Sequence, residues 1–340
     1  MRKQENVIIT GASAGVGRAV ANLFASKGAT VGLIARNLKR LESAADEVKQ
    51  SGGRALVLPA DVSNAVQVES AAERFVREFG SIDIWVNCAM VTIYGEINTI
   101  EPDEFRRVTE VTYLGYVYGT QSALKRMIPQ SSGTIVQVGS ILAYRSIPLQ
   151  SPYCGAKHAI RGFSDSVRSE LIHNKNKIWI TAVHLPAVNT PQFSWCKNNL
   201  ERKPQPVAPV YKPEVAAEAI FWAAHHRRRE VVLGTRSQFF IWGNKFFPGI
   251  ADWYTAKTMY DAQQYDGPDS KDRPDNLWNS VEGNFGSNGN FSKGQRTKSF
   301  HLMLLKLPGY QYLGIFIASL ILSGVLKCLV KKSIQYKERS

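Results

Sequence analysis

The chain has 340 residues, a formal net charge of +14 and four cysteines. The cysteines, at positions 88, 154, 196 and 328, follow neither a disulfide nor a metal-ligand pattern, so we expect a reducing compartment and no metal. Residues 291–340 carry nine Lys or Arg against one acid, which places most of the excess charge in the tail. Because no recognition motif accompanies this charge, we expect it to favour anionic lipid and no nucleic acid.

The first predicted elements are a strand, a glycine-rich turn and a helix. Residues 6–10 are an apolar run typical of a buried strand, and an amphipathic helix follows with Val20, Leu23 and Phe24 on one face. The intervening glycines let the backbone turn sharply and approach a diphosphate, whose charge the helix N-terminus favours. The turn therefore predicts a dinucleotide site formed by Gly11, Ser13, Gly15, Val16 and Gly17.

The end of the second predicted strand bears on the choice of cofactor. Residues 30–34 lead into Ala35, Arg36 and Asn37, where NAD-binding folds place a carboxylate on the ribose 2′-hydroxyl. No carboxylate stands there, and the guanidinium of Arg36, with the hydroxyl of Ser13, suits a 2′-phosphate. We therefore expect NADP(H) over NAD(H), with a solvated strand-end charge as the alternative role of Arg36.

Three residues further along the chain suggest proton-transfer chemistry. Ser140 follows an apolar strand at residues 134–138, so its hydroxyl is expected at the carboxyl edge of the sheet. Tyr153 and Lys157 are four apart and share a helix face, which lets the ammonium favour the phenolate and lower the Tyr pKa. The spacing alone is weak evidence, and it gains weight from the glycine-rich turn.

The remaining pattern predicts one doubly wound sheet. Strand signals recur near residues 6, 30, 55, 82–87, 134–138, 179–184 and 230–233, with helical stretches between them. This alternation is typical of parallel βαβ units, so we expect a single Rossmann-type α/β domain with helices on both faces. Residues 187–213 break the pattern with aromatics and prolines, and they predict either an apolar substrate pocket or a loop that closes the core.

The order of these motifs over residues 5–235 resembles the short-chain dehydrogenase/reductase family, whose glycine spacing is G-x-x-x-G-x-G. The resemblance implies that Ser140 orients a carbonyl or alcohol, that Tyr153 is the general acid/base, and that Lys157 binds the nicotinamide ribose and lowers the Tyr pKa. It also implies a homodimer. The family's further cofactor contacts map onto Asp61, Val62, Asn87, Ala89, Pro186, Val188 and Thr190.

Three positions depart from the family pattern. Thr112 stands where many relatives have an Asn that holds a water of the proton relay, so we assign Thr112 to the catalytic set. Met90 and Ala187 each replace a glycine near the expected nicotinamide site. We therefore expect an NADP(H)-dependent oxidoreductase that interconverts a carbonyl and an alcohol on an apolar small molecule, and as the alternative a catalytically weak NADPH-binding sensor or scaffold at a membrane.

The C-terminal part predicts an extension of the catalytic domain, which we place at residues 1–250. Residues 251–306 are polar and rich in Gly and Asn, which predicts a flexible connector, and D-R-P-D-N-L-W at 272–278 resembles an extension in a bacterial branch of the family. Residues 307–330 open with twenty uncharged positions and predict a single membrane anchor, followed by a basic tail at 331–340. A helix lying on the membrane or docked on the protein is the alternative. Because the N-terminus lacks an apolar signal region, we expect a cytoplasmic catalytic domain bound to the bilayer through this helix.

Overall fold

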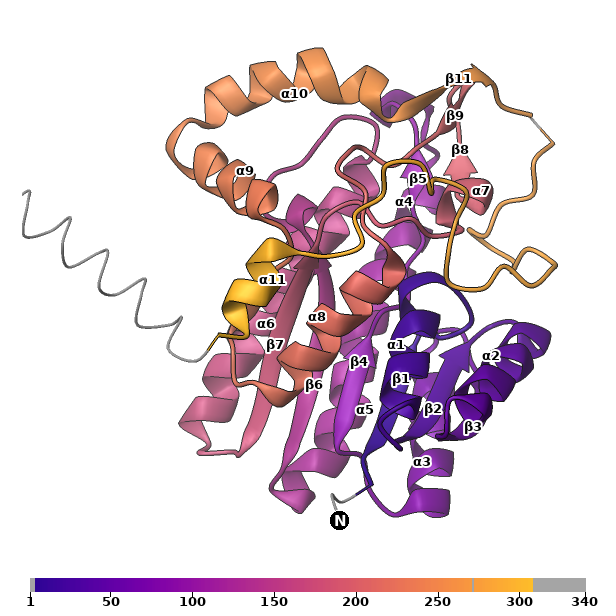
Figure 1. Ribbon diagram of the computed structural model, residues 1–340, viewed down its shortest axis with the longest axis vertical. Helices are drawn as coiled ribbons and strands as arrows, with labels where there is room; N and C mark the ends of the chain where they lie inside the picture. The colour runs from indigo at the N-terminus through magenta and orange to yellow at the C-terminus, as the bar shows by residue number, and fades with distance from the viewer. Residues whose placement is uncertain (1–3, 271, 308–340) are drawn as a thin grey trace, which may run out of the picture. The chain divides into compact units, whose positions relative to one another are not determined.

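A seven-stranded parallel sheet forms the centre of the computed structural model, which describes residues 4–270 and 272–307 (Figure 1). The strand order is β10-β7-β6-β4-β1-β2-β3, and every neighbouring pair is parallel. The strands are β1 Asn6–Thr10, β2 Thr30–Ala35, β3 Arg54–Pro59, β4 Ile84–Asn87, β6 Gly133–Ser140, β7 Ile178–Leu185 and β10 Glu230–Val232. All seven predicted strands are confirmed.

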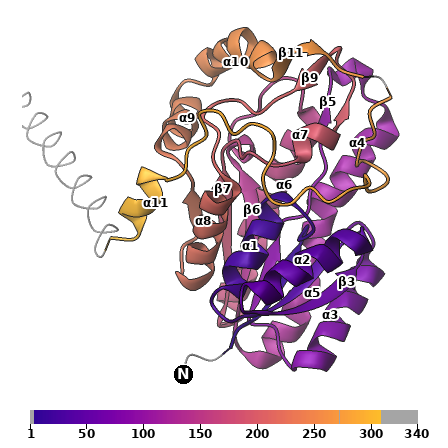
Figure 2. The ribbon, with the colours of Figure 1, turned by 45° about the vertical axis from the view of Figure 1, so that its right-hand side comes forward.

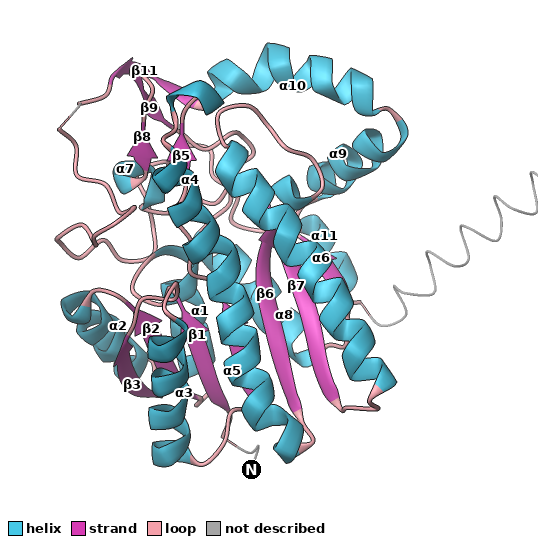
Figure 3. Cartoon of the chain, turned by 180° about the vertical axis from the view of Figure 1, so that it is seen from behind, coloured by secondary structure: helices cyan, strands magenta, loops and turns pink. Residues whose placement is uncertain are grey.

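Helices cover both faces of this sheet. One face carries α1 Gly15–Ala25, α2 Leu38–Gln50 and α8 Pro213–His225 (Figure 1). The other carries α3 Ala65–Phe79, α5 Gly115–Gln130 and α6 Ser151–His173 (Figure 3). Helix α4 Pro102–Thr109 continues into α5 through a π-helical turn at Glu110–Leu114. The arrangement confirms the doubly wound Rossmann-type fold.

Burial on both faces explains why the strands are almost continuously apolar. Val7, Ile8 and Ile9 of β1 are fully buried, as a parallel sheet covered on two sides requires. Strand β1 pairs with β2 on one side and β4 on the other, so the chain reverses its direction of travel across the sheet there. Such a switch point opens a crevice at the carboxyl ends of the strands, where open α/β sheets bind their ligands.

Smaller elements lie at the carboxyl end of the sheet (Figures 1 and 2). They come from the connections that follow β4, β6, β7 and β10, so they surround the crevice. These elements are β5 Ile93–Tyr94, η1 Ile97–Thr99, η3 Ile141–Ala143, α7 Gln192–Trp195, β8 Lys197–Asn198, β9 Arg202–Pro204, α9 Thr235–Phe246, α10 Pro248–Ala262 and β11 Gln264–Pro268. β5 pairs with β8, and β9 pairs antiparallel with β11.

The structure differs from the expected flexible connector at 251–306. Residues up to 268 continue in α10 and β11, and the described residues from 272 to 298 belong to the same compact unit as the sheet. A second unit begins at Ser299 and contains α11 Phe300–Leu305. Although the stretch to residue 298 is polar, it is held in place, because side chains of the Rossmann domain bind its backbone.

The predicted anchor at 307–330 and the basic tail at 331–340 lie outside the described residues, apart from Leu307. Within the described part of the chain, none of the helices has both the length and the apolar character needed to cross a bilayer. The membrane anchor stays a prediction.

Candidate active site

A cavity of about 630 Å³ occupies the crevice at the switch point. It extends from the glycine-rich turn at the start of α1 to the inner side of α9 and α10. Most of the predicted site residues line it: Gly11, Ser13, Gly15, Val16, Gly17, Arg36, Asp61, Val62, Ala89, Ser140, Tyr153, Lys157, Pro186, Val188 and Thr190. The sequence motifs therefore meet in one place although they span most of the sheet.

The glycine-rich turn has the shape that a dinucleotide needs. Gly11 has φ +71°, and a Cβ there would lie 2.8 Å from the Cα of Ala89. A Cβ at Gly17 would collide with the carbonyl of Gly11. Only glycine fits these two positions, and the N-terminus of α1 consequently lines the cavity at backbone level. The cradle fits the diphosphate of a nicotinamide adenine dinucleotide.

Thr10 holds the neighbouring strand end against this turn. Its Oγ1 accepts hydrogen bonds from the backbone N–H groups of Cys88, at 2.9 Å, and Ala89, at 3.1 Å. These bonds fix the backbone that follows β4 beside the glycine-rich turn. We did not single out Thr10 from the sequence, although it immediately precedes the glycine motif.

Two predicted site residues, Asn87 and Thr112, do not line the cavity. Asn87 is fully buried and donates from Nδ2 to Gln137 Oε1 at 2.9 Å within a polar network. Thr112 is also fully buried, donates to the carbonyl of Val91 at 2.8 Å and accepts from its N–H at 3.0 Å. The hydroxyl of Thr112 is thus engaged with the backbone of Val91, and its expected water-holding role stays a prediction.

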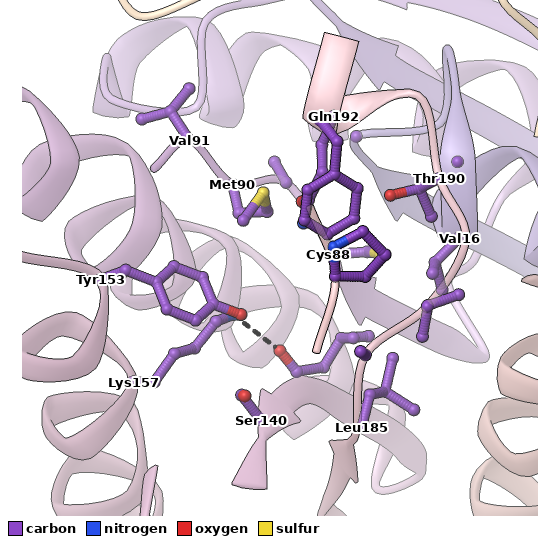
Figure 4. Close-up of a pocket in the computed structure, with 18 of the residues that line it drawn as sticks. Val16, Cys88, Met90, Val91, Ser140, Tyr153, Lys157, Leu185, Thr190 and Gln192 are labelled. Carbon is purple, nitrogen blue, oxygen red and sulfur yellow. Dashed lines mark hydrogen bonds between the residues drawn. The ribbon is translucent and has the colours of Figure 1, made fainter. Parts of the chain in front are cut away.

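Ser140, Tyr153 and Lys157 lie together on one side of the cavity, across from Val16 and Thr190 (Figure 4). Lys157 is 2% exposed and donates from Nζ to the carbonyl of Val138 at 2.9 Å and to the Tyr116 hydroxyl at 3.1 Å. The same Nζ lies 5.5 Å from the centre of the Tyr153 ring. The ammonium is therefore held in place by two oxygens while it faces the phenol.

Burial sets the protonation of both groups. It lowers the pKa of Lys157 to about 7. Burial also raises the pKa of Tyr153 above its usual value, while the hydrogen bond with Ser140 acts in the opposite direction. The sequence predicted a lowered Tyr pKa, and the structure differs because burial outweighs the hydrogen bond with Ser140. Tyr153 therefore keeps its proton at neutral pH, which suits a proton donor.

Ser140 is fixed at the strand end by its neighbours. Its Oγ accepts from the N–H of Leu142 at 3.1 Å and caps the short helix η3. Its carbonyl lies 3.1 Å from Nδ1 of His184, and burial lowers the pKa of His184 to about 4. Because a carbonyl only accepts, the neutral imidazole donates from Nδ1. His184 is thus a positioning residue for Ser140.

Arginine side chains dominate the opposite end of the cavity, at the ends of β2 and β3. Arg36 donates to the carbonyls of Trp278, at 2.7 Å, and Asn276, at 2.6 Å. Arg40 lines the same end, donates to the carbonyl of Gly283 at 2.7 Å, and has a buried Nη2 with no hydrogen-bond partner in the described part of the chain. An unsatisfied guanidinium nitrogen is costly unless a ligand completes it, and phosphate suits it well.

Asp61 is held as an anion at the same end. Burial acts to raise its pKa, but hydrogen bonds from Arg107, at 2.6 Å, and from Ser63 keep it below the usual value. Arg107 also donates from Nε to the carbonyl of Leu277 at 3.0 Å. The adenine-contact residue predicted from the family is therefore tied to the C-terminal segment through one arginine.

Residues 276–289, which we call the strap, form the outer wall of this end (Figure 2). The strap carbonyl of Gly286 accepts from the N–H of Gly15 at 3.0 Å, and the side chain of Leu277 is fully buried. Asn276 and Ser280 line the cavity. The strap was missed because its Gly, Asn and Ser content is typical of a flexible segment, and the D-R-P-D-N-L-W segment at 272–278, which overlaps its start, was its one sequence signal.

Comparison with known proteins identifies the family. The family model described as short chain dehydrogenase matches residues 5–199. An uncharacterized oxidoreductase of Bacillus subtilis, YxnA, is 31% identical over 308 residues, which cover 90% of this chain and 86% of that protein. The chain belongs to the short-chain dehydrogenase/reductase family. It is accordingly an oxidoreductase that acts on CH–OH groups with a nicotinamide dinucleotide.

Two further relatives are similar in part. A fatty acyl-CoA reductase of Acinetobacter baylyi is 28% identical over 231 residues, covering 67% of this chain and 76% of that enzyme. The crystal structure of a 3-ketoacyl-ACP reductase from Sinorhizobium meliloti superimposes with a TM-score of 0.59 at 27% identity, covering 67% of this chain and 96% of that chain. The match to YxnA is long enough to include the strap.

Proposed function

We propose that the protein is an NADP(H)-dependent reductase of an apolar carbonyl compound, with Tyr153 as general acid. The observation that carries the cofactor choice is the pair Arg36 and Arg40. Two guanidinium groups line the adenosine end of the cavity, and one of them has a buried nitrogen without a partner among the described residues. A 2′-phosphate supplies the charge and the acceptor oxygens that this pair favours.

The residues of the chain provide the proton and the orientation. The bound nicotinamide supplies the hydride. The hydroxyl of Ser140 holds the substrate oxygen at the edge of β6, and the protonated phenol of Tyr153 donates to that oxygen as negative charge develops on it. The charged Nζ of Lys157, held by Val138 and Tyr116, stabilises the phenolate that remains.

The substrate end of the cavity supports an apolar substrate. Beyond Ser140 and Tyr153 its walls are largely aliphatic and aromatic. The side chains at this end include Leu142, Ile147, Leu185, Phe193, Val207, Phe240 and Met259. Pockets of this composition bind ligands mainly by burial of apolar surface. The similarity to a fatty acyl-CoA reductase favours the same class of compound.

The test is the oxidation of NADPH and NADH by the full chain with a panel of apolar aldehydes and ketones. We expect turnover with NADPH, and a loss of roughly 10²- to 10⁴-fold in Tyr153→Phe, since that variant cannot donate the proton. Cofactor binding, measured by fluorescence, should be unchanged in the variant. Turnover that survives the substitution would refute the role of Tyr153.

A second candidate is a sensor that binds NADPH without efficient turnover. It is favoured by Thr112, whose hydroxyl is engaged with Val91 and offers no support to a relay water, and by Met90, which lines the cavity. Tight binding of NADPH with no turnover on any tested compound, equal in wild type and Tyr153→Phe, supports this candidate over the reductase.

Two proposals concern assembly and place in the cell. The helices α4 and α6 support a homodimer by analogy with the family, which sedimentation of the purified protein tests. The uncharged positions 307–326 support a bilayer anchor on a cytoplasmic enzyme. If the anchor operates, a chain ending at residue 298 should leave the membrane fraction of cells after a high-salt wash, whereas the full chain should stay in it.

A further inference from the structure

The helices α9 and α10 have an inverted pattern of burial. Their only fully buried side chains are the small polar groups Ser237 and Thr255. Large apolar side chains face outward instead, at helical spacing. An amphipathic helix on a water-facing surface shows the opposite pattern, with its apolar stripe turned inward. The outer face of these helices is therefore unlike an ordinary solvent-exposed surface.

Six large apolar residues make up this outer face. On α9 they lie three and four residues apart, and from the N-cap of α10 onward they lie three residues apart. They are Phe239, 74% exposed, Trp242, 59%, Phe246, 61%, Phe247, 62%, Ile250, 66%, and Trp253, 61%. We call this set the aromatic face. A concentration of large exposed apolar side chains within fifteen residues marks an interaction site and not a random surface.

The charged side chains around the aromatic face differ in their ion pairing. Its two carboxylates, Asp252 and Asp261, are paired with arginines of the main domain, at 2.7 and 3.7 Å. The cations are left over: Arg236 and Lys245 have no ion pair among the described residues, and Lys257 lies 4.5 Å from the ring centre of Trp253. Apolar aromatics bordered by unpaired cations match a surface that is apolar inside and anionic outside.

The mouth of the cavity lies at this same surface. Tyr254 lines the cavity and is 45% exposed, so it stands at the opening. Arg236 is likewise exposed and lines the cavity, while Phe240 and Met259 form the wall behind them. An apolar molecule leaving the aromatic face can therefore enter the cavity along the inner sides of the two helices.

We propose that the aromatic face lies in the headgroup region of an anionic phospholipid bilayer and opens the cavity toward the lipid. Trp and Tyr favour this region, Phe and Ile extend into the acyl boundary, and Arg236, Lys245 and Lys257 bind phosphate groups. The chain also continues past the described residues with twenty uncharged positions, 307–326, which suit the same bilayer. The lipid contact itself is independent of the proposed reaction. Only the entry of substrate from the lipid rests on the proposed function.

Quenching of tryptophan fluorescence by lipid tests the contact at the site itself. The full chain is mixed with vesicles of phosphatidylcholine and phosphatidylglycerol whose acyl chains carry bromine. We expect strong quenching in wild type. The double variant Trp242→Phe/Trp253→Phe should lose most of it while still sedimenting with the vesicles, because phenylalanine keeps the apolar contact. Trp278→Phe, which removes an exposed tryptophan outside the face, should leave the quenching unchanged.

A charge substitution gives the second readout. Ile250→Glu should weaken binding of the full chain to these vesicles by roughly tenfold, since burying one large aliphatic side chain is worth about that factor. Val66→Glu on α3, at a β-branched residue of 74% exposure, is the matched control and should bind as wild type. Phosphatidylcholine alone should bind more weakly than the anionic mixture.

Three results would overturn the proposal. Equal quenching in wild type and the double variant would place other tryptophans in the lipid. Unchanged vesicle binding in Ile250→Glu would assign membrane attachment to another part of the chain. A shift of Ile250→Glu to a smaller species in sedimentation without lipid would show that a second copy of the chain covers the aromatic face.

Discussion

Arg36 donates a 2.7 Å hydrogen bond to the carbonyl of Trp278, a residue 242 positions further along the chain. The side chain expected to recognise the cofactor thus also holds the strap that covers the cofactor's adenosine end. Arg107 bridges Asp61 and Leu277 in the same way. The proposed recognition of the cofactor and the observed attachment of the C-terminal segment therefore involve the same guanidinium groups.

The first prediction concerns Arg36→Ala. The dissociation constant for NADPH should rise roughly tenfold to a hundredfold, because charge-assisted hydrogen bonds to the 2′-phosphate are lost, while that for NADH should change much less. Titration of cofactor fluorescence measures both. Lys39→Ala, which removes an exposed cation of α2, is the control. Equal weakening for the two cofactors would mean that Arg36 acts only through the strap.

The second prediction concerns the strap residue Leu277, which is fully buried in the main core. Leu277→Ala should lower the free energy of unfolding by about 2–5 kcal/mol, the usual cost of a cavity at a buried leucine. Denaturant unfolding of the full chain measures the change, with Val66→Ala as the exposed control. A strap that is dispensable for the fold would leave the unfolding midpoint where it is in wild type.

The third prediction concerns pH. Burial lowers the pKa of Lys157 to about 7, so its ammonium is charged below that pH and neutral above it. In the proposed mechanism this charge stabilises the Tyr153 phenolate, so kcat/KM for carbonyl reduction should fall as pH rises through about 7. Lys157→Arg, which stays charged, should flatten this limb of the profile. A profile that is equally steep in the variant would assign the transition to another group.

The same pKa shift has a consequence for stability. The unfolded chain holds the Lys157 proton up to the usual pKa of 10.5, whereas the folded protein releases it near 7. Between these values the unfolded state binds more protons, so this group makes the protein more stable as pH rises from about 7 to 10.5. Lys157→Met should remove that dependence from the unfolding free energy measured across the window.

The fourth prediction separates two roles of Thr112. Thr112→Val removes both hydrogen bonds to the backbone of Val91 and should cost about 1–3 kcal/mol of stability. If the role is structural, kcat measured well below the unfolding temperature should stay close to wild type, and Thr112→Ser should restore stability. A large loss of kcat in a variant that remains folded would instead support a role of Thr112 in the proton relay.

Much of the fold was predictable because its signals are local. An apolar run such as residues 6–10 and the glycines that follow it specify a strand and a tight turn without reference to distant residues. The cavity-lining position of Ser140 followed from the parallel sheet, since strand ends share one edge, and Tyr153 and Lys157 share one face of the helix that comes next in the sequence. These predictions needed only the order of the elements.

The features that the sequence did not predict depend on residues that are far apart in the chain. The strap is ordered by Arg36, Arg40 and Arg107, whose bonds to it span 170 to 243 positions, so its composition alone resembles a connector. The raised pKa of Tyr153 results from burial, which helix spacing does not reveal. Thr112 matched a family position, but its hydroxyl is directed to the backbone of Val91.

The hydrogen bond between Gly15 and Gly286 joins two segments that are synthesised far apart in time. The ribosome releases the glycine-rich turn first and the strap only after all seven strands of the sheet, so a nascent chain can assemble the whole sheet before its cofactor site has an outer wall. A polypeptide ending after β10 would contain every sequence motif of the family yet lack that wall. The segment that completes the wall of the cavity thus lies well beyond the last strand of the sheet in the sequence.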